Sequence, residues 1–273
     1  MAGPRGAGST GHIEPEYLDI TLAAESMAAT AISVVIYLTA TAQISSATRS
    51  LSAAMAGSEE EKRTAAHAAA ELVRDGELVG LGSGSTVAHL LPALAARRLR
   101  IRCVAASPET ARAATALGLE ILAFEEVDRL DIAIDGADQI APDGWLIKGG
   151  GAAHTREKIV AAASDRFIVI ASSAKLVAAL SPPVPLELLR FGLDATLAAL
   201  GAVELRDVPP SPDGGLIADY LAPFEDPAGL ARRLSETPGV VEHGLFSPSF
   251  SKEIIVARGD QLIRLSPGAN PPA

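Results

Sequence analysis

Short apolar runs alternate with longer amphipathic stretches along the chain from about residue 58 onward. The apolar runs have the length of buried strands, and the stretches between them have the length of helices. We expect strands at 77–81, 101–105, 120–124, 130–134 and 167–171, and helices at 58–74, 87–98, 109–117 and 152–164. Strands separated by helices predict parallel βαβ units, and therefore an α/β protein with a doubly wound sheet.

The pattern changes near residue 182, where Pro182, Pro183 and Pro185 interrupt it. Beyond these prolines we expect strands at 186–189, 216–220 and 240–245, and helices at 194–200 and 227–236. This order is typical of a small α+β lobe. The apolar runs at 253–257 and 261–265 predict a closing hairpin around Gly259 and Asp260.

The first 57 residues differ from the rest of the chain. Residues 1–20 are rich in Gly, Pro and acids, and Ser26 to Thr48 carry no charge. A dispensable extension, a cleaved targeting segment and a membrane anchor are the three interpretations. Nine Ser, Thr or Gln residues within the uncharged stretch argue against a membrane span, and the acids before it argue against a signal peptide. We therefore expect a disordered extension over residues 1–57, with Met55 as a plausible start of the functional chain.

Bulk composition limits the classes of partner. The net charge of −10 repels nucleic acid and anionic membranes, so we expect neither as a partner. The single cysteine, Cys103, excludes an intramolecular disulfide, which fits a reducing cytoplasm. Cys103 lies in an apolar run, so a small buried hydrophobic side chain is the better interpretation than a nucleophile.

The first segment that indicates chemistry is the loop Gly82-Ser83-Gly84-Ser85-Thr86, between an expected strand and an expected helix. Its glycines expose backbone N–H groups, its hydroxyls add donors, and the helix start adds a positive field, which together suit an anion. No Lys precedes the Ser/Thr pair, and Val87 stands where a dinucleotide-binding loop has its third glycine. An ordinary strand–helix turn is the alternative.

Of two further loops, one follows an expected strand and the other leads into an expected helix. Asp135-Gly136-Ala137-Asp138 carries two carboxylates, which can bind sugar hydroxyls or move protons. Lys148-Gly149-Gly150-Gly151 combines a cation with a backbone that a ligand can approach closely. Helix capping and a flexible surface loop are the ordinary explanations for each. Because ligands bind at the carboxyl ends of parallel strands, we expect all three loops to converge on one site.

Glu157 follows the third loop, inside the helix that this loop begins, between Arg156 and Lys158. An isolated glutamate in such a place is by default a solvated helix residue. The neighbouring loops make a second interpretation possible, in which Glu157 is a base that faces the same site.

These segments together resemble the ribose-5-phosphate isomerase A family. The family signature combines a GxGST loop, a DGADE-type loop and a KGGGxxxxREK segment, and this chain has matching residues at 82–86, 135–139 and 148–158 in the same order. Lys175 and Lys62 correspond to basic residues of the family, and the likeness extends over about residues 59–265. Gln139 departs from the pattern, because the family has an acid there.

The resemblance implies a Rossmann-like catalytic domain over residues 58–182 and 258–273, and a smaller ferredoxin-like α+β lobe over 183–257. It also implies a cytoplasmic homodimer or homotetramer that converts D-ribose 5-phosphate to D-ribulose 5-phosphate in the non-oxidative pentose phosphate pathway, without metal or cofactor. Two rivals remain, namely a nucleotide-dependent oxidoreductase and a non-catalytic sugar-phosphate sensor.

Residue roles follow from the same resemblance. Glu157 would be the base that moves the proton between C2 and C1, and Lys148 with the glycine-loop N–H groups would stabilise the oxyanion. Asp135 and Asp138 would hold hydroxyls, and Asp135 would assist opening of the sugar ring. Ser85, Thr86, Lys175 and Lys62 would hold the phosphate, and the remaining substrate-binding set comprises Ser83, Gly84, Gly136, Ala137, Gly149, Gly150 and Gly151.

Overall fold

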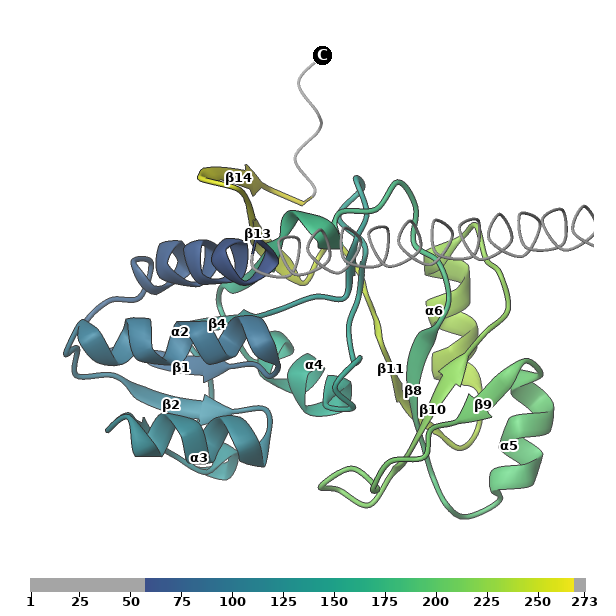
Figure 1. Ribbon diagram of the computed structural model, residues 1–273. Helices are drawn as coiled ribbons and strands as arrows, with labels where there is room; N and C mark the ends of the chain where they lie inside the picture. Colours follow the sequence, from purple (N-terminus) through teal and green to yellow (C-terminus); the bar gives the residue numbers. More distant parts are fainter. Residues whose placement is uncertain (1–56, 268–273) are drawn as a thin grey trace, which may run out of the picture. The chain divides into compact units, whose positions relative to one another are not determined.

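The computed structural model describes residues 57–267, so the expectations for residues 1–56 lie outside its described part (Figure 1). The described chain is helical from residue 57 to residue 70, which agrees with the first expected helix. Among the described residues, no helix has both the length and the hydropathy that crossing a membrane requires.

A seven-stranded sheet forms the centre of the larger part. Its strand order is β14-β13-β7-β4-β1-β2-β3, and every neighbouring pair is parallel except β13 and β14. The order reverses between β1 and β4, which is the position where doubly wound sheets bind ligands. The strands are β1 (Leu78–Leu81), β2 (Arg102–Ala105), β3 (Glu120–Ile121), β4 (Ile132–Asp135), β7 (Phe167–Ser172), β13 (Ser251–Arg258) and β14 (Gln261–Leu265).

Helices cover both faces of this sheet. Because the strands are buried on both faces, their sequences are unbroken apolar runs. Successive side chains alternate between faces. Ile132 and Ile134 pack with the first helix and with α2 (Ser85–Ala96), whereas Ala133 packs on the opposite face with α4 (His154–Ala162). A further helix, α3 (Pro108–Ala116), begins at a Ser107 cap and contacts α2 and β2.

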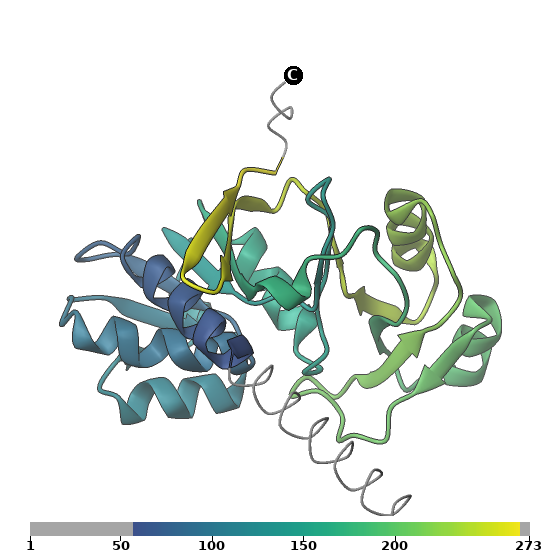
Figure 2. The same ribbon diagram turned by 45° about the horizontal axis from the view of Figure 1, so that its top comes forward.

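The smaller lobe has a four-stranded antiparallel sheet in the order β11-β8-β10-β9 (Figure 2). Its elements contain the three expected strands and two expected helices and add the unexpected β9, in a βαββαβ order: β8 (Val184–Leu188), α5 (Leu193–Leu200), β9 (Val203–Leu205), β10 (Leu216–Tyr220), α6 (Pro227–Glu236) and β11 (Val240–His243). Leu186, Ala218 and Leu234 lie in its own apolar cluster. This confirms the fold class that the sequence predicts.

A three-stranded sheet, β12-β6-β5, was not predicted. Each of its strands is two residues long: β5 (Gln139–Ile140), β6 (Leu146–Ile147) and β12 (Leu245–Phe246). Such short strands carry no periodic pattern in the sequence. They matter because β5 and β6 bring the second and third loops together.

Other expectations were confirmed or corrected. The hairpin around Gly259 and Asp260 is confirmed by the pairing of β13 with β14. The strand expected at 120–124 is shorter, because β3 ends at Ile121 and a single 3₁₀ turn occupies Phe124–Glu126. The predicted boundary at residue 257 falls inside β13, so the chain rejoins the large sheet earlier, at Ser251.

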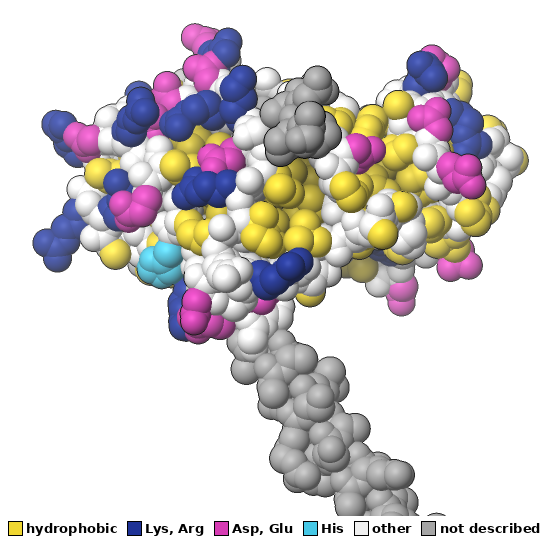
Figure 3. Space-filling model, turned by 90° about the horizontal axis from the view of Figure 1, so that it is seen from above, with side chains coloured by type: hydrophobic (Ala, Val, Ile, Leu, Met, Phe, Trp, Pro, Cys, Tyr) yellow, Lys and Arg dark blue, Asp and Glu magenta, His cyan; other side chains and the backbone are white. Residues whose placement is uncertain are grey.

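Figure 3 shows one face of the molecule, on which side chains of both charge signs are interspersed around an apolar area. The net negative charge is therefore not gathered into one patch on this face. Cys103 is buried, and burial raises the pKa of its thiol to about 12, in agreement with a hydrophobic packing role.

Candidate active site

The three loops converge on one cavity. This cavity lies at the carboxyl ends of β1 and β4, where the strand order reverses. It contains every predicted site residue except Asp135 and Lys62, and its lining comprises Ser83, Gly84, Ser85, Thr86, Gly136, Ala137, Asp138, Lys148, Gly149, Gly150, Gly151, Glu157 and Lys175. The predicted convergence is therefore confirmed.

The first loop requires glycine where it passes the second. A Cβ atom on Gly82 would lie 1.8 Å from Cγ of Asp135, so only glycine fits between β1 and that carboxyl group. Gly84 has φ +88°, a left-handed conformation that favours glycine, and α2 begins at the next residue, Ser85. The loop thus presents the start of a helix, with its unpaired N–H groups and positive dipole end, to the cavity.

Asp135 is the last residue of β4 and is only 2% exposed. Its Oδ1 accepts hydrogen bonds from the backbone N–H of Ser83 at 3.0 Å and of Gly136 at 2.7 Å. Its Oδ2 accepts one from Nζ of Lys148 at 2.8 Å. Asp135 therefore lies behind the cavity wall, and its contacts are with the protein.

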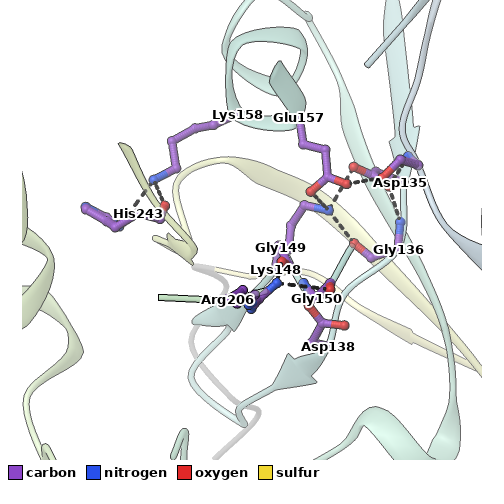
Figure 4. A network of polar contacts seen from close by, with 11 residues as sticks. Asp135, Gly136, Asp138, Lys148, Gly149, Gly150, Glu157, Lys158, Arg206 and His243 are labelled. Carbon is purple, nitrogen blue, oxygen red and sulfur yellow. Dashed lines mark hydrogen bonds and ion pairs between the residues drawn. The ribbon is translucent and has the colours of Figure 1, made fainter. Parts of the chain in front are cut away.

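Lys148 follows β6 directly and is 2% exposed. Its Nζ donates to Asp135 and to the carbonyl oxygen of Gly136 at 2.7 Å, and it lies 3.0 Å from Oε2 of Glu157 (Figure 4). One ammonium group thus holds two carboxylates from different elements. The ring of Phe246 packs against the same group, with its centroid 5.4 Å from Nζ.

Glu157 lies in the first turn of α4 and is 5% exposed, so it is not the solvated helix residue that its isolated sequence suggests. Oε1 accepts a hydrogen bond from the hydroxyl of Ser83 at 2.5 Å. Oε2 forms the ion pair with Lys148, but no described residue donates a well-aligned hydrogen bond to it. Oε2 of Glu157 is thus buried beside the Lys148 ammonium, in a residue that lines the cavity.

The charges of this cluster are strongly coupled. Burial raises the pKa of Asp135 to about 7, the Glu157 carboxylate adds to that shift, and the Lys148 ammonium opposes it. Burial alone would lower the pKa of Lys148, but the two carboxylates outweigh it and raise that pKa above its usual value. Lys148 is consequently a permanent cation, whereas the Asp135 carboxyl beside it can exchange a proton near neutral pH.

The glycine loop is held from two sides. Gly149 has φ +102°, and a Cβ there would lie 2.7 Å from Nδ1 of His154, so the loop rests directly on that ring. His154 is fully buried, and burial lowers its pKa to about 4, so the ring is neutral. On the cavity side, the N–H of Gly150 donates to Oδ2 of Asp138 at 2.7 Å.

The two lysines expected near the phosphate, Lys175 and Lys62, differ in whether they line the cavity. Lys175 lines the cavity, in a 3₁₀ turn after β7. Lys62 instead pairs with Glu59 at 2.6 Å and does not line it. The helix turns Glu61 toward the Lys175 segment, where its carboxylate accepts from the N–H of Ser173 at 2.9 Å. The expected role of Lys62 therefore has no support in this geometry.

Gln139, which departs from the family pattern, also faces away from the cavity. Its side-chain amide exchanges hydrogen bonds with the backbone of Ser181 at 2.8 and 2.9 Å. An amide satisfies both a donor and an acceptor there, which a carboxylate cannot do. The substitution thus leaves the site itself unchanged.

Sequence reasoning missed several supporting residues. Lys158 is buried, and its Nζ reaches Glu242 at 2.7 Å and the carbonyl of His243 at 2.6 Å, which fastens α4 to β11. Arg206, between β9 and β10, donates to carbonyl oxygens of Gly149 and Gly150. Neither contact has a signal in the sequence, because each joins residues far apart along the chain.

A wider cleft of about 810 Å³ adjoins the cavity and shares Ser83, Gly84, Ser85, Gly150 and Gly151 with it. Arg156 and Asp213 form a bidentate ion pair beside this cleft, at 2.7 Å for both contacts. Within residues 57–267, no group of three or more His, Cys, Asp and Glu side chains is arranged to hold a metal ion.

Comparison with known proteins gives a consistent result. The family model described as ribose 5-phosphate isomerase A (phosphoriboisomerase A) matches residues 102–261. The ribose-5-phosphate isomerase A of Caulobacter vibrioides is 44% identical over 225 residues, which cover 77% of this chain and 99% of that protein. The protein of the same name from Halobacterium salinarum is 46% identical over 70% of this chain and 89% of its own length.

Solved structures agree. A crystal structure of ribose 5-phosphate isomerase A from Neisseria gonorrhoeae superposes with a TM-score of 0.73 at 31% identity, covering 77% of this chain and 97% of that chain. A D-ribose-5-phosphate isomerase in complex with phospho-erythronic acid gives a TM-score of 0.72 at 32% identity, covering 77% and 99%. A second family model, the DeoR C terminal sensor domain, matches only residues 58–124.

Proposed function

The chain belongs to the ribose-5-phosphate isomerase A family, and from this premise we propose that it interconverts D-ribose 5-phosphate and D-ribulose 5-phosphate through an enediolate, with Glu157 as the base. The single observation that carries the assignment of the base is the buried cluster at the cavity wall. There, the Ser83 hydroxyl and the Lys148 ammonium hold the buried Glu157 carboxylate in place at the cavity.

Substrate binding begins with the phosphate. We assign it to the end of the cavity formed by the start of α2, with Ser85, Thr86 and Lys175. Helix N–H groups, hydroxyls and an ammonium group are the donors that a phosphate dianion takes up. Asp138, whose carboxylate is already oriented by the N–H of Gly150, is suited to accept from a sugar hydroxyl.

The chemical step moves one proton from C2 to C1. Glu157 removes the C2 proton from the open-chain aldose, the electron pair forms the C1–C2 double bond, and the aldehyde oxygen becomes an oxyanion, which takes up the proton that the C2 hydroxyl gives up. Returning the proton to C1 while O2 becomes a carbonyl completes the ketose. Substrate and product are isomers, so the net reaction needs no redox cofactor. A carboxylate suits this task because it accepts and returns a proton without remaining bonded to carbon.

Stabilisation of the oxyanion comes from two sources in this proposal. The N–H of Gly151 makes no hydrogen bond within residues 57–267 and lies at the cavity, so it is available to an oxygen of the substrate. Lys148 adds a fixed positive charge beside the reacting carbons. Donors that are already oriented need no rearrangement when the charge develops.

Asp135 contributes through Lys148 rather than by touching the sugar, because it lies behind the cavity wall. Together with Glu157 it keeps the ammonium group charged and fixes its position. This proposal therefore revises the expectation that Asp135 holds a substrate hydroxyl or opens the sugar ring.

Turnover of ribose 5-phosphate by the purified protein tests this function. We expect conversion to the ketose and, in ²H₂O, deuterium at C1 of the product or at C2 of recovered aldose, as an enediolate with exchange requires. Tight binding of ribose 5-phosphate without any turnover would instead support the sensor. That alternative is not favoured, because the sensor-domain match ends at residue 124, before Asp135, Lys148 and Glu157.

We also propose a cellular setting. The chain would act in the non-oxidative pentose phosphate pathway of the cytoplasm, as a homodimer or homotetramer, with the sheet containing β1 and the sheet containing β8 as two lobes. The family supports the pathway, and the single cysteine fits the compartment. Light scattering of the purified chain distinguishes the oligomeric states.

A further inference from the structure

Arg206 connects the small lobe to the glycine loop of the site. It follows β9, and its backbone N–H donates to the carbonyl of Ile217 in β10 at 2.9 Å. Its guanidinium group forms a bidentate pair with Asp219 of β10, at 2.8 Å from Nε and 2.7 Å from Nη2. Both side chains are largely buried, at 18% and 19% exposure. The guanidinium is therefore held in one orientation before it contacts the loop.

The remaining nitrogen of the same group donates to two consecutive carbonyls. Nη1 of Arg206 lies 2.9 Å from the oxygen of Gly149 and 3.1 Å from the oxygen of Gly150 (Figure 4). In a trans peptide the C=O of one residue and the N–H of the next point in opposite directions. Two carbonyls directed at Arg206 therefore direct the N–H groups of Gly150 and Gly151 away from it.

The contacts of those N–H groups agree with this deduction. The N–H of Gly150 reaches Oδ2 of Asp138 at 2.7 Å, at the cavity. The N–H of Gly151 also belongs to a cavity-lining residue, and it makes no hydrogen bond among the described residues. Successive N–H groups on one side of a loop form a concave site for an anion.

We propose that Arg206, held by Asp219, is a positioning residue that fixes the glycine loop so that the Gly151 N–H faces the oxyanion of the enediolate, while the Gly150 N–H orients Asp138. The proposal rests on the proposed isomerase function. This positioning role requires the guanidinium group, because three glycines in succession have no side chains that would restrict their own backbone conformation. A charged, bidentate donor that is anchored elsewhere supplies the missing restraint.

The effect should fall on the chemical step. Loss of one oriented oxyanion donor lowers kcat by about 10²–10³-fold in other enzymes. Arg206→Lys keeps the positive charge but cannot hold Asp219 through a fork and two carbonyls at once, so we expect kcat to fall by about 10–10²-fold. The KM for ribose 5-phosphate should change by less than about threefold, because the residues assigned to the phosphate, Ser85, Thr86 and Lys175, are not part of the glycine loop.

A matched control is available in the same cleft. Arg156 and Asp213 also form a bidentate pair, but Arg156 does not contact the glycine loop. Arg156→Lys should therefore leave kcat within about twofold of the parent enzyme. Asp219→Asn, which frees the guanidinium group without removing it, should give an intermediate loss.

The experiment measures kcat, KM and the urea midpoint of unfolding for the full chain and these variants, and adds free guanidinium at millimolar concentration to Arg206→Ala. We expect the added guanidinium to restore part of kcat in that variant and to leave Arg156→Lys unchanged. A purely structural role would lower the midpoint without a selective loss of kcat.

The outcomes separate the two proposals. If the parent chain does not turn over ribose 5-phosphate, the proposed function fails. If the parent is active and Arg206→Lys keeps kcat within about twofold of Arg156→Lys, the positioning role is wrong. Failure of guanidinium to restore activity to a folded Arg206→Ala also contradicts it, and if Arg206→Ala does not fold, Arg206→Lys alone decides.

Discussion

Replacement of Lys148 by Met tests the electrostatic design of the site. Met has nearly the length of Lys but no charge, so the variant leaves Asp135 and Glu157 buried at 2% and 5% exposure without a cation. It also removes the donor to the Gly136 carbonyl. Removing one partner of a buried ion pair costs about 3–5 kcal/mol. We expect the free energy of unfolding at pH 8 to fall by about that amount, and activity to be lost.

The pH dependence of this loss gives a sharper test. Two neighbouring carboxylates without an ammonium group bind a proton more readily. At mildly acidic pH, folding of the variant should therefore be accompanied by more proton uptake than folding of the parent. Its deficit should therefore shrink as pH falls from 8 to 5. Urea unfolding at both pH values measures this. A deficit below about 1 kcal/mol at pH 8, or one that grows toward pH 5, would refute the reasoning.

A suitable control removes a different buried ammonium group. Lys158→Met leaves one carboxylate, Glu242, without its partner, and that carboxylate is more exposed, at 27%. We expect a smaller loss of stability than for Lys148→Met. Equal losses of stability in the two variants would show that two carboxylates left without Lys148 cost no more free energy than one left without Lys158.

Three further predictions concern substrate, proton and metal. Replacing Ser85 and Thr86 by Ala should raise KM for ribose 5-phosphate far more than it impairs turnover of unphosphorylated ribose, and equal losses on both sugars would show that the loop does not bind phosphate. The kcat/KM of the parent should fall as pH drops through about 7, the pKa of Asp135. Asp135→Asn should be less active overall and should lack that inflection. An unchanged inflection in Asp135→Asn would show that Asp135 is not the group that titrates. Activity should survive EDTA, and complete loss restored by one divalent ion would contradict a metal-free mechanism.

Local patterns in the sequence predict most of the fold. Alternation of apolar runs and helices gives the βαβ units, and the strand limits at 216–220 and 261–265 match β10 and β14. The convergence of the three loops follows from one rule of parallel sheets, because the ends of β1 and β4 are adjacent in the strand order.

The remaining features depend on contacts between distant segments. Strands β5, β6 and β12 are too short to show a period, yet they place Lys148 beside Asp138. The rotation of the first helix, which turns Glu61 rather than Lys62 toward the Lys175 segment, depends on packing and not on propensity. The contact of Arg206 with Gly149 joins two lobes, and no local pattern encodes it.

The central claim, that Glu157 moves the proton, is tested most directly by the kcat of Glu157→Gln with ribose 5-phosphate. Gln keeps the shape and can still accept from Ser83, but it cannot take a proton from carbon. We predict a fall in kcat of about 10²–10⁴-fold with binding retained, while Glu109→Gln, an exposed acid at the edge of the neighbouring cleft, leaves kcat unchanged. A Glu157→Gln variant that turns over within about fivefold of the parent would contradict the claim.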